Sequence, residues 1–451
     1  MRSYTKSLEL LERLRKVTPG GAQTMSKRAE RFTEGAFPVA LYQAAGADVV
    51  DVDGNMYLDM ICGLASMTLG YSEIGNLALK VENSVINQIS LGHAFSLATE
   101  LEAEVSEKIC ELIPCAEMVR FVKSGSEATE AAIRVARKAT GRDLILTVKE
   151  GYHSWHSWFQ AIKPEHPGIP ELYTRMVHAL PYNDLEQFRQ SFEQCAVDGY
   201  KVAAVILEPC HYEAPHPDFL RGLRNLCFNY GALLIFDEMV TGFRWANGGA
   251  QDYFGVTPDL ATFGKACANG YPLAFLCGKR EYMQHADVVS GTFGGDCIGL
   301  AACNAVLDIY KTEPIIETLW QRGRQFQDGI NALIKSLNIP AICDGFAVKP
   351  RILFIQPDGD PYYTPGEIGS QRTSWKDMAM SLFIQELAER GVLWHPAGGN
   401  ISAAMTEQDI DFAIDAAGSA LSIVKQALTS GDWSALKGKP IQPSQFVRGG
   451  A

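Results

Sequence analysis

Residues 232–265 read ALLIFDEMVTGFRWANGGAQDYFGVTPDLATFGK, and this segment indicates the class of the fold. It starts with a continuous apolar run, Ala232 to Phe236, the pattern of a short strand buried on both faces of a parallel sheet. Asp237 follows directly. Ligands of open α/β sheets bind at the carboxyl ends of the strands, so we expect this carboxylate to face a ligand. The alternative, an Asp-Glu pair that only ends a buried strand, fits these residues equally well.

Lys265 closes the segment, after a second strand-like run from Asp259 to Thr262. A lysine normally lies on the solvated surface, and that is the simpler interpretation. A buried lysine is costly unless its charge is relieved or used, which is how lysines that form Schiff bases with carbonyl groups arise. The segment therefore offers a candidate acid and a candidate amine nucleophile.

Strand-like and helix-like segments alternate around this region, from about residue 117 to residue 310. The strand candidates are residues 118–122, 144–148, 202–207, 233–236, 260–263 and 274–277. This alternation predicts an α/β fold, with a mostly parallel sheet and helices on both faces.

The two ends of the chain have other patterns. Residues 40–55 look like strands closed by the turn signal Asp53-Gly54, whereas long helical stretches predominate after residue 313. We predict three parts: an N-terminal part of a small lobe (1–60), a large α/β domain (61–312) and a C-terminal lobe (313–451).

Composition excludes several classes of protein. Of 451 residues, 47% are apolar and 20% are charged, which is typical of a soluble globular protein. A net charge of −12 disfavours nucleic acid as a partner, and no apolar run approaches the roughly 18 residues of a membrane span. The eleven cysteines show no paired CxxC spacing, so we predict no metal site and no disulfide framework. A reduced cytoplasm is the simplest location.

A possible anion site lies at residues 121–128, FVKSGSEA, where a strand passes directly into a helix. Free N–H groups and the helix dipole favour an anion at such a place. A serine that only caps the helix, either Ser124 or Ser126, is the more usual explanation. Gly125 favours the anion, because it lacks a side chain where a phosphate could approach the backbone.

Together with these elements, GYH (151–153), DEMVTGFR (237–244), TFGKACANGYPLA (262–274) and GTF (291–293) make a specific combination. It resembles the class III aminotransferase family of fold-type I enzymes, which depend on pyridoxal 5′-phosphate (PLP). The resemblance is strongest to the glutamate-1-semialdehyde aminomutase-like branch. It implies that both termini build one small α+β lobe beside the large PLP-binding domain.

The resemblance also implies roles for residues. Lys265 would hold PLP as an aldimine and move a proton between the substrate and the cofactor, while Asp237 would pair with the pyridine nitrogen. Tyr152 would stack on the ring, worth about 0.5 to 1.5 kcal/mol beyond its area burial. His153 fits a cofactor contact and a satisfied core histidine equally well. The implied cofactor contacts are Ser124, Gly125, Ser126, Tyr152, His153, Glu208, Asp237, Met239, Lys265 and Thr292. Thr292 would reach the cofactor of the neighbouring subunit, which implies a homodimer.

Several residues depart from the branch. Lys123 stands where we expect Asn or Thr, Ser154 replaces a glycine after GYH, and Glu213 replaces an Asn beside the ring. The position of the substrate-binding arginine falls on Lys27, with Arg28 beside it, and a cation there is not interchangeable with an arginine fork.

Two further departures concern the reaction. Leu64 occupies the place of an aromatic pocket residue, and residues 394–400, WHPAGGN, are shorter than the aminomutase gating loop and carry no acid. An aminomutase must retain its diamino intermediate, so a missing gate favours ordinary transamination between an amino donor and a ketone or aldehyde. A 1,2-aminomutase and a racemase or epimerase are alternatives within the family. A PLP-binding regulatory protein and a silent α/β binding protein are alternatives outside it.

Overall fold

The computed structural model describes residues 2–149, 151–163, 168–210, 212–355, 367–368, 371–372 and 374–442. The described chain forms two compact units: residues 2–64, 69–78 and 317–442 in the first, and residues 65–68 and 79–316 in the second. The predicted domain boundaries near residues 61 and 313 stay a prediction. Residues 443–451 of the predicted C-terminal lobe lie outside the described residues.

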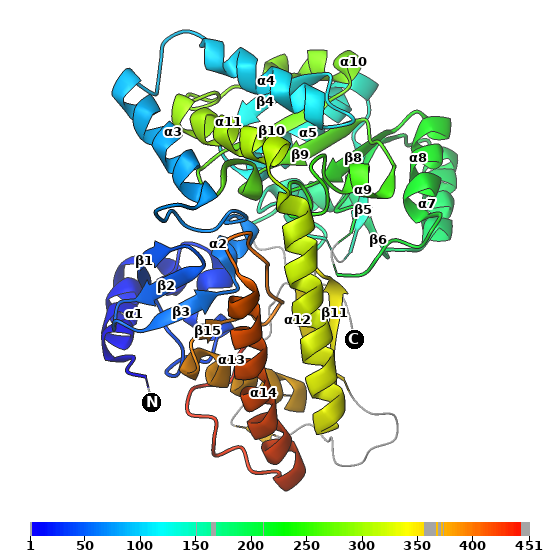
Figure 1. Cartoon of the computed structure of the whole chain (residues 1–451). Helices are drawn as coiled ribbons and strands as arrows, with labels where there is room; N and C mark the ends of the chain where they lie inside the picture. The colour runs from blue at the N-terminus through cyan, green and yellow to red at the C-terminus, as the bar shows by residue number, and fades with distance from the viewer. Residues whose placement is uncertain are drawn as a thin grey trace. The chain divides into compact units, whose positions relative to one another are not determined.

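A seven-stranded sheet forms the centre of the second unit, in the order β4-β10-β9-β8-β7-β5-β6 (Figure 1). Its strands are β4 (Met118–Val122), β5 (Leu144–Val148), β6 (Val177–Leu180), β7 (Val202–Leu207), β8 (Leu233–Asp237), β9 (Leu260–Phe263) and β10 (Ala274–Gly278). All neighbouring pairs are parallel except those of β10, which runs antiparallel to β4 and to β9. The predicted α/β class and mostly parallel sheet are confirmed.

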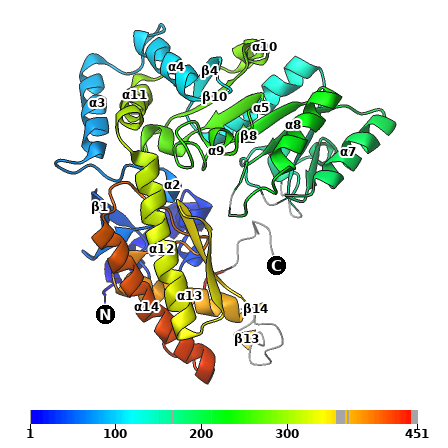
Figure 2. The same cartoon turned by 45° about the vertical axis from the view of Figure 1, so that its right-hand side comes forward.

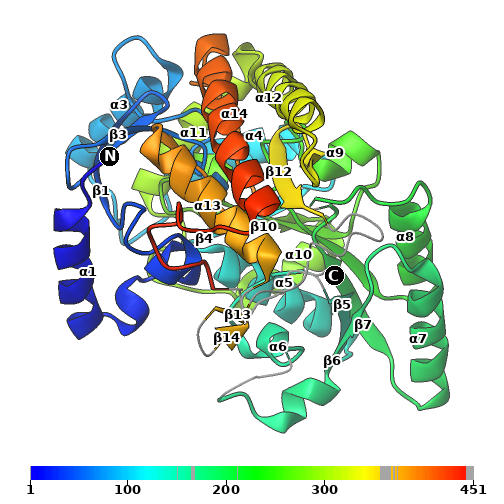
Figure 3. The same cartoon turned by 90° about the horizontal axis from the view of Figure 1, so that it is seen from below.

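The helices of the second unit are α3 (Leu77–Leu91), α4 (Glu100–Leu112), α5 (Gly125–Thr140), α6 (Ser157–Gln160), α7 (Leu185–Val197), α8 (Phe219–Tyr230), α9 (Ala250–Phe254), α10 (Arg280–Met283) and α11 (Cys297–Thr312). Helices α3 and α4 precede β4, and the other helices lie between the strands or after them in the chain. Alanine and β-branched residues of α5 pack on buried residues of β7, β8, β9 and β10 in one core cluster. Helices α7 and α8 lie side by side near β5, β6 and β7 (Figure 3).

The first unit holds a small sheet of order β1-β2-β3-β15, built from β1 (Leu41–Ala45), β2 (Asp48–Asp51), β3 (Met56–Asp59) and β15 (Val392–Leu393). Its helices are α1 (Thr5–Val17), α2 (Cys62–Ala65), α12 (Ile315–Leu337), α13 (Trp375–Glu389) and α14 (Glu407–Ser430). Two antiparallel pairs join β11 (Ala341–Phe346) to β12 (Lys349–Phe354) and β13 (Glu367–Ile368) to β14 (Gln371–Arg372). Helices α12, α13 and α14 pack side by side (Figure 2).

The helices run as their patterns indicate. The amphipathic start of the chain forms α1, which buries Leu11. Helix α3 begins only at Leu77, because Glu73 to Asn76 form a turn in which the side chain of Asn76 bonds backbone groups. No helix of the described ranges is long and apolar enough to cross a membrane.

Candidate active site at the carboxyl edge of the sheet

The parallel strands of the second unit end at one edge, and the predicted site residues follow these ends. Asp237 is the last residue of β8 and lies in register with Thr262 of β9. Leu207 of β7 lies in register with Phe236, which places Glu208 beside Asp237. Lys265 follows β9 by two residues. The edge therefore collects two acids and an amine from three adjacent strands, where α/β folds bind their ligands.

Asp237 is held by three donors. Its Oδ2 lies 2.8 Å from Nδ1 of His153, and its Oδ1 accepts the backbone N–H of Met239 at 3.1 Å. The hydroxyl of Thr262 donates to the same Oδ1 at 3.4 Å. Asp237 is only 1% exposed, and the His153 side chain is completely buried. A buried carboxylate is stable only with such partners, and its position is correspondingly fixed.

The proton on His153 follows from these contacts. Nδ1 faces a carboxylate and therefore donates, while Nε2 is buried without a hydrogen-bond partner among the described residues. The rings of Trp158 and Phe159 surround the imidazole, with centroids 6.3 and 5.3 Å away. The hydrogen bond to Asp237 therefore places a proton on Nδ1 and fixes the orientation of the ring.

Lys265 has an unusual backbone conformation. It begins a short 3-10 helix (Lys265–Ala268) and has φ of 48°, in the left-handed region that non-glycine residues rarely adopt. Such conformations cost about 1 to 3 kcal/mol and cluster at functional sites. Gly264, which precedes it, has extended backbone.

The turn after β4 carries the cap of helix α5. Ser124 is the N-cap of α5 and makes a capping box with Glu127, as one of the two sequence interpretations predicted. A Cβ added to Gly125 would lie 2.8 Å from Sδ of Met239, and a Cβ added to Gly264 would also lie 2.8 Å from that sulfur. Met239 therefore lies between the helix turn and the lysine turn, and its thioether fills the space beside both glycines.

Tyr152 and Glu208 lie next to this centre. The backbone N–H of Tyr152 donates to Oε1 of Glu208 at 3.0 Å, and the tyrosine ring meets Phe159 edge-on, with centroids 5.8 Å apart. The Tyr152 side chain is 40% exposed, whereas Glu208 is buried. The tyrosine thus presents ring surface at the strand edge while its backbone is fixed.

Thr292 lies in an exposed turn, residues 291–295, between Val289 and α11. Gly294 N–H donates to the carbonyl of Gly291 at 3.0 Å, and Asp296 caps α11 by accepting from Ile298 and Gly299. The amine of Lys123 pairs with the carboxylate of Asp296. Lys123, the departure from the expected Asn or Thr, therefore connects the anion-site turn to the Thr292 turn.

Glu213 belongs to an irregular segment. Its Oε1 accepts from the amide of Asn183, which also donates to the carbonyl of Ala214 and accepts from His216 N–H. Asn183 follows the edge strand β6 and has φ of 64°. The carboxylate is thus partly occupied by an amide of the protein.

The predicted substrate cations lie in the first unit. Lys27 is exposed, whereas the guanidinium of Arg28 packs against Gly20, where an added Cβ would clash with it. Arg28 Nε is buried without a hydrogen-bond partner among the described residues. The roles of both residues stay predictions.

Two further segments singled out by the sequence also lie in the first unit. Leu64 is part of α2, where Cys62, Leu64 and Ala65 all have positive φ. In the segment 394–400, Trp394 is buried and stacks on Phe326, with centroids 5.4 Å apart. A Cβ on Gly399 would overlap the Trp394 ring, so this segment is packed and not a free loop.

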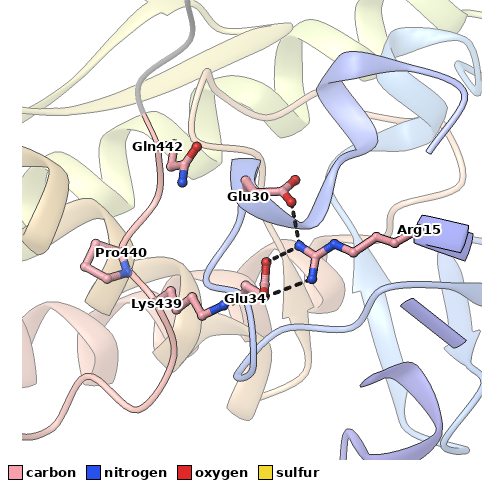
Figure 4. Close-up of a pocket in the computed structure, with 6 residues that line it drawn as sticks. All are labelled: Arg15, Glu30, Glu34, Lys439, Pro440 and Gln442. Atoms are coloured by element: carbon pink, nitrogen blue, oxygen red, sulfur yellow. Dashed lines mark hydrogen bonds and ion pairs between the residues drawn. The ribbon is translucent and has the colours of Figure 1, made fainter. Parts of the chain in front are cut away.

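A small cavity in the first unit is unrelated to these predictions (Figure 4). Arg15 bonds Glu30 at 2.5 Å and Glu34 at 2.6 Å, and Lys439 bonds Glu34 at 2.7 Å. Arg15 holds the pKa of Glu34 below its usual value. These charged side chains pair with one another at the cavity, and the ion pairs link helix α1 to the C-terminal segment.

Sequence reasoning gave no role to Glu238. It is fully buried and accepts the backbone N–H groups of Ala250 and Gln251 at 2.7 and 2.9 Å, and the hydroxyl of Thr241. Burial raises its pKa to about 7. Glu238 holds the segment after β8 in place, so the two acids of the Asp-Glu pair have different surroundings.

Comparison with known proteins agrees with this geometry. Residues 31–343 match the model of the family Aminotransferase class-III. The chain is 35% identical over 434 residues to a 3-aminobutyryl-CoA aminotransferase of Cloacimonas acidaminovorans (strain Evry), covering 94% of this chain and 98% of that protein. It is 34% identical over 430 residues to a glutamate-1-semialdehyde 2,1-aminomutase of Syntrophobacter fumaroxidans (strain DSM 10017 / MPOB), covering 90% and 95%.

Solved structures resemble the fold over nearly the whole chain. The FumI protein of Sphingopyxis sp. MTA144 in its PLP internal aldimine form has a TM-score of 0.84 at 28% identity, covering 97% of this chain and 99% of that one. An omega-transaminase from Sphaerobacter thermophilus has a TM-score of 0.82 at 26% identity, covering 93% and 98%.

Proposed function

The chain belongs to the class-III aminotransferase family, and from this premise we propose that it is a PLP-dependent aminotransferase that moves an amino group from an amino donor to a ketone or aldehyde acceptor. The observation that carries the proposal is the arrangement at the carboxyl edge of the second unit's sheet. A buried Asp237 ends β8, and Lys265 follows the adjacent strand in a strained conformation.

The residues at this edge fit PLP. The start of α5 offers its backbone N–H groups and the positive end of its dipole to a phosphate. Asp237 offers a carboxylate to a pyridinium N–H, and Tyr152 offers an exposed ring. We assign Ser124, Gly125 and Ser126 to the phosphate, Asp237 to the ring nitrogen, and Lys265 to the carbonyl carbon. Tyr152, His153, Glu208 and Met239 complete the surroundings.

Each residue then has a chemical task. PLP, when bound, supplies an electron-poor ring that stabilises negative charge at the substrate carbon bearing the amine. Asp237 keeps the ring nitrogen protonated, because the carboxylate favours the charged form of its partner. His153 donates Nδ1–H to Asp237 and so keeps that carboxylate oriented. The amine of Lys265 would take the proton from the substrate carbon that bears the amine as general base, and would give it up again as general acid.

The 1,2-aminomutase reaction is the second candidate, favoured by 34% identity to an aminomutase. Residues 394–400 favour the aminotransferase, since that segment has no acid and is packed around Trp394. An ungated site releases its keto product, which is what transamination requires.

We also propose a homodimer in which Thr292 reaches the partner's cofactor. The Thr292 turn exposes Phe293 (58%), and the nearby segment exposes Leu91 (73%) and Leu97 (83%). These segments are neighbours, because Cys297 N–H donates to the carbonyl of His93 at 2.9 Å. Contiguous exposed apolar side chains mark protein interfaces. The cytoplasm is the location that we propose.

The test is spectroscopic. The purified protein should carry the visible absorption band of lysine-bound PLP, and Lys265→Ala should lack it. Asp237→Asn should keep cofactor but lose most turnover. A colourless wild type that added PLP cannot reconstitute would refute the proposal. Single amino donors, added without a keto acid, should convert the band to that of the amine form; isomerised product without this conversion would favour the aminomutase.

A further inference from the structure

We propose that Lys123 is a positioning residue that fixes the Thr292 turn of its own subunit, and thereby supports cofactor binding in the partner subunit. The inference rests on the proposed function, because the turn acts across the interface only if the protein is a dimer that binds PLP. It concerns a residue whose identity departs from the expected Asn or Thr of the branch.

The first step is the attachment of the turn to β4. The guanidinium of Arg120 donates from Nε to the carbonyl of Val289 at 2.9 Å, before the turn. After the turn, the amine of Lys123 pairs with Asp296. Between them, a Cβ on Gly294 would lie 3.1 Å from the carbonyl oxygen of Phe121. Arg120 of β4 and Lys123, just after this strand, thus hold residues 289–296 at both ends, and Gly294 lies close to β4 between them.

The second step is the position of the ion pair. The side chain of Lys123 is 28% exposed and that of Asp296 is 10% exposed, so water screens the pair less than a surface pair. The other oxygen of Asp296 caps α11 by accepting from Ile298 at 3.2 Å and from Gly299 at 3.5 Å. Lys123 therefore joins the exposed turn to a helix start that is already fixed.

The third step is the relation of Lys123 to the anion site. Its backbone N–H donates to Oε2 of Glu127, the acid that closes the capping box of α5. One residue thus belongs to its own subunit's phosphate turn through its backbone, and to the Thr292 turn through its side chain. Because the side chain is committed to Asp296, we infer that it serves the turn and not its own phosphate.

Amide hydrogen exchange on the apoprotein tests the attachment without cofactor. Lys123→Met, which keeps length and removes charge, should speed exchange in residues 290–296 by about fivefold or more, as expected for loss of a charge-assisted hydrogen bond. Asp296→Asn, which still caps α11, should do the same, and the double variant should add little further. Lys123→Arg should restore slow exchange.

Lys138→Met is the matched control. Lys138 lies in the last turn of α5, the helix that begins just after Lys123, and its exposed amine pairs with Asp287 at 2.5 Å. Asp287 lies before the Arg120–Val289 contact, which separates this pair from the Thr292 turn. Substitution of Lys138 should leave exchange in residues 290–296 unchanged. Unchanged exchange in both Lys123→Met and Asp296→Asn overturns the attachment.

Mixed dimers test the effect across the interface. A Lys265→Ala subunit gives no visible band, so the band reports only its partner. When the Lys265→Ala subunit also carries Lys123→Met, the intact partner should bind PLP about fivefold more weakly. When Lys123→Met lies instead in the subunit that retains Lys265, binding should equal that of the reference dimer.

The outcomes distinguish a failure of this inference from a failure of the proposed function. Weaker binding only in the second arrangement shows that Lys123 acts on its own phosphate turn and overturns the inference, as does no change in either arrangement. A wild type that is monomeric overturns the inference as well, while its band still reports the cofactor. A dimeric wild type that never develops the band refutes the proposed function itself.

Discussion

His153 and Asp237 come from loop and strand positions 84 residues apart, and their side chains meet at 2.8 Å in a buried hydrogen bond. The imidazole has no other hydrogen-bond partner among the described residues, and its surroundings are aromatic. The histidine is therefore both a core residue and a neighbour of the proposed ring contact. The two interpretations of its sequence position are compatible.

The first prediction concerns this pair. His153→Phe keeps an aromatic ring in the core but leaves Asp237 without its buried donor. A hydrogen bond to a charged group contributes about 1.5 to 3 kcal/mol, so we expect kcat to fall about 10- to 100-fold. Stopped-flow rates of the donor half-reaction measure this loss. Trp158→Phe, which alters the ring packed on His153, should retain near-normal rates; equal losses in both variants would show that only packing matters.

The second prediction concerns Met239. Gly125→Ala places a methyl group against its sulfur, and overpacking of this kind costs about 1 to 3 kcal/mol. We expect PLP to bind roughly tenfold more weakly to the apoprotein, as measured by return of the visible band. Met239→Ala in the same chain removes the obstacle and should recover much of the affinity. If the double variant binds PLP as weakly as Gly125→Ala alone, contact with Met239 is not the cause of the weaker binding.

The third prediction uses the strained backbone of Lys265. An alanine at φ of 48° retains a cost of about 1 to 2 kcal/mol that glycine lacks, while glycine loses about 0.5 to 1 kcal/mol through chain entropy. In the apoprotein, Lys265→Gly should therefore unfold at a temperature at least as high as Lys265→Ala. The buried neighbour Ala266 has negative φ and serves as control, because Ala266→Gly should lower stability. An alanine variant clearly more stable than the glycine variant would contradict the strain.

The fourth prediction is a pH dependence. The hydrogen bonds from Arg15 hold the pKa of Glu34 below its usual value, so the unfolded chain binds the proton more readily than the folded one. The stabilisation is fully present above about pH 5 and is lost as pH falls through the lowered pKa. Glu34→Gln should cost about 1 to 2 kcal/mol at pH 7, with a difference from wild type that shrinks in acid. Urea unfolding at several pH values measures it, and Glu12→Gln on exposed α1 should show no such trend.

Much of the central sheet could be predicted from the sequence because buried parallel strands are continuous apolar runs. Residues 118–122, 144–148, 202–207 and 260–263 are strands with the predicted bounds. The sequence pattern does not predict the edge strand β6, because His178 interrupts the apolar run of VHAL. A strand at the edge of a sheet needs no long apolar run. Strand β11 was missed because Asp344 and Gly345 break its pattern.

The elements of the site could be predicted one by one, but their contacts could not. The sequence indicates Asp237 and Lys265 as site residues because each comes shortly after a strand-like run. The meeting of His153 with Asp237, of Met239 with Gly125, and of Lys123 with Asp296 depends on how distant segments cross at the sheet edge. No local period or spacing encodes such crossings, so only the folded chain reveals them.

The thioether of Met239 has a consequence for the protein under oxidative stress. Met239 is half-buried, and its sulfur lies 2.8 Å from the place that an added Cβ would take at Gly125 and at Gly264. Conversion to the sulfoxide adds a polar oxygen at that point, and the proposed phosphate turn and lysine turn would have to separate to accept it. Peroxide would thus disable the site through one atom, and a methionine sulfoxide reductase would repair it.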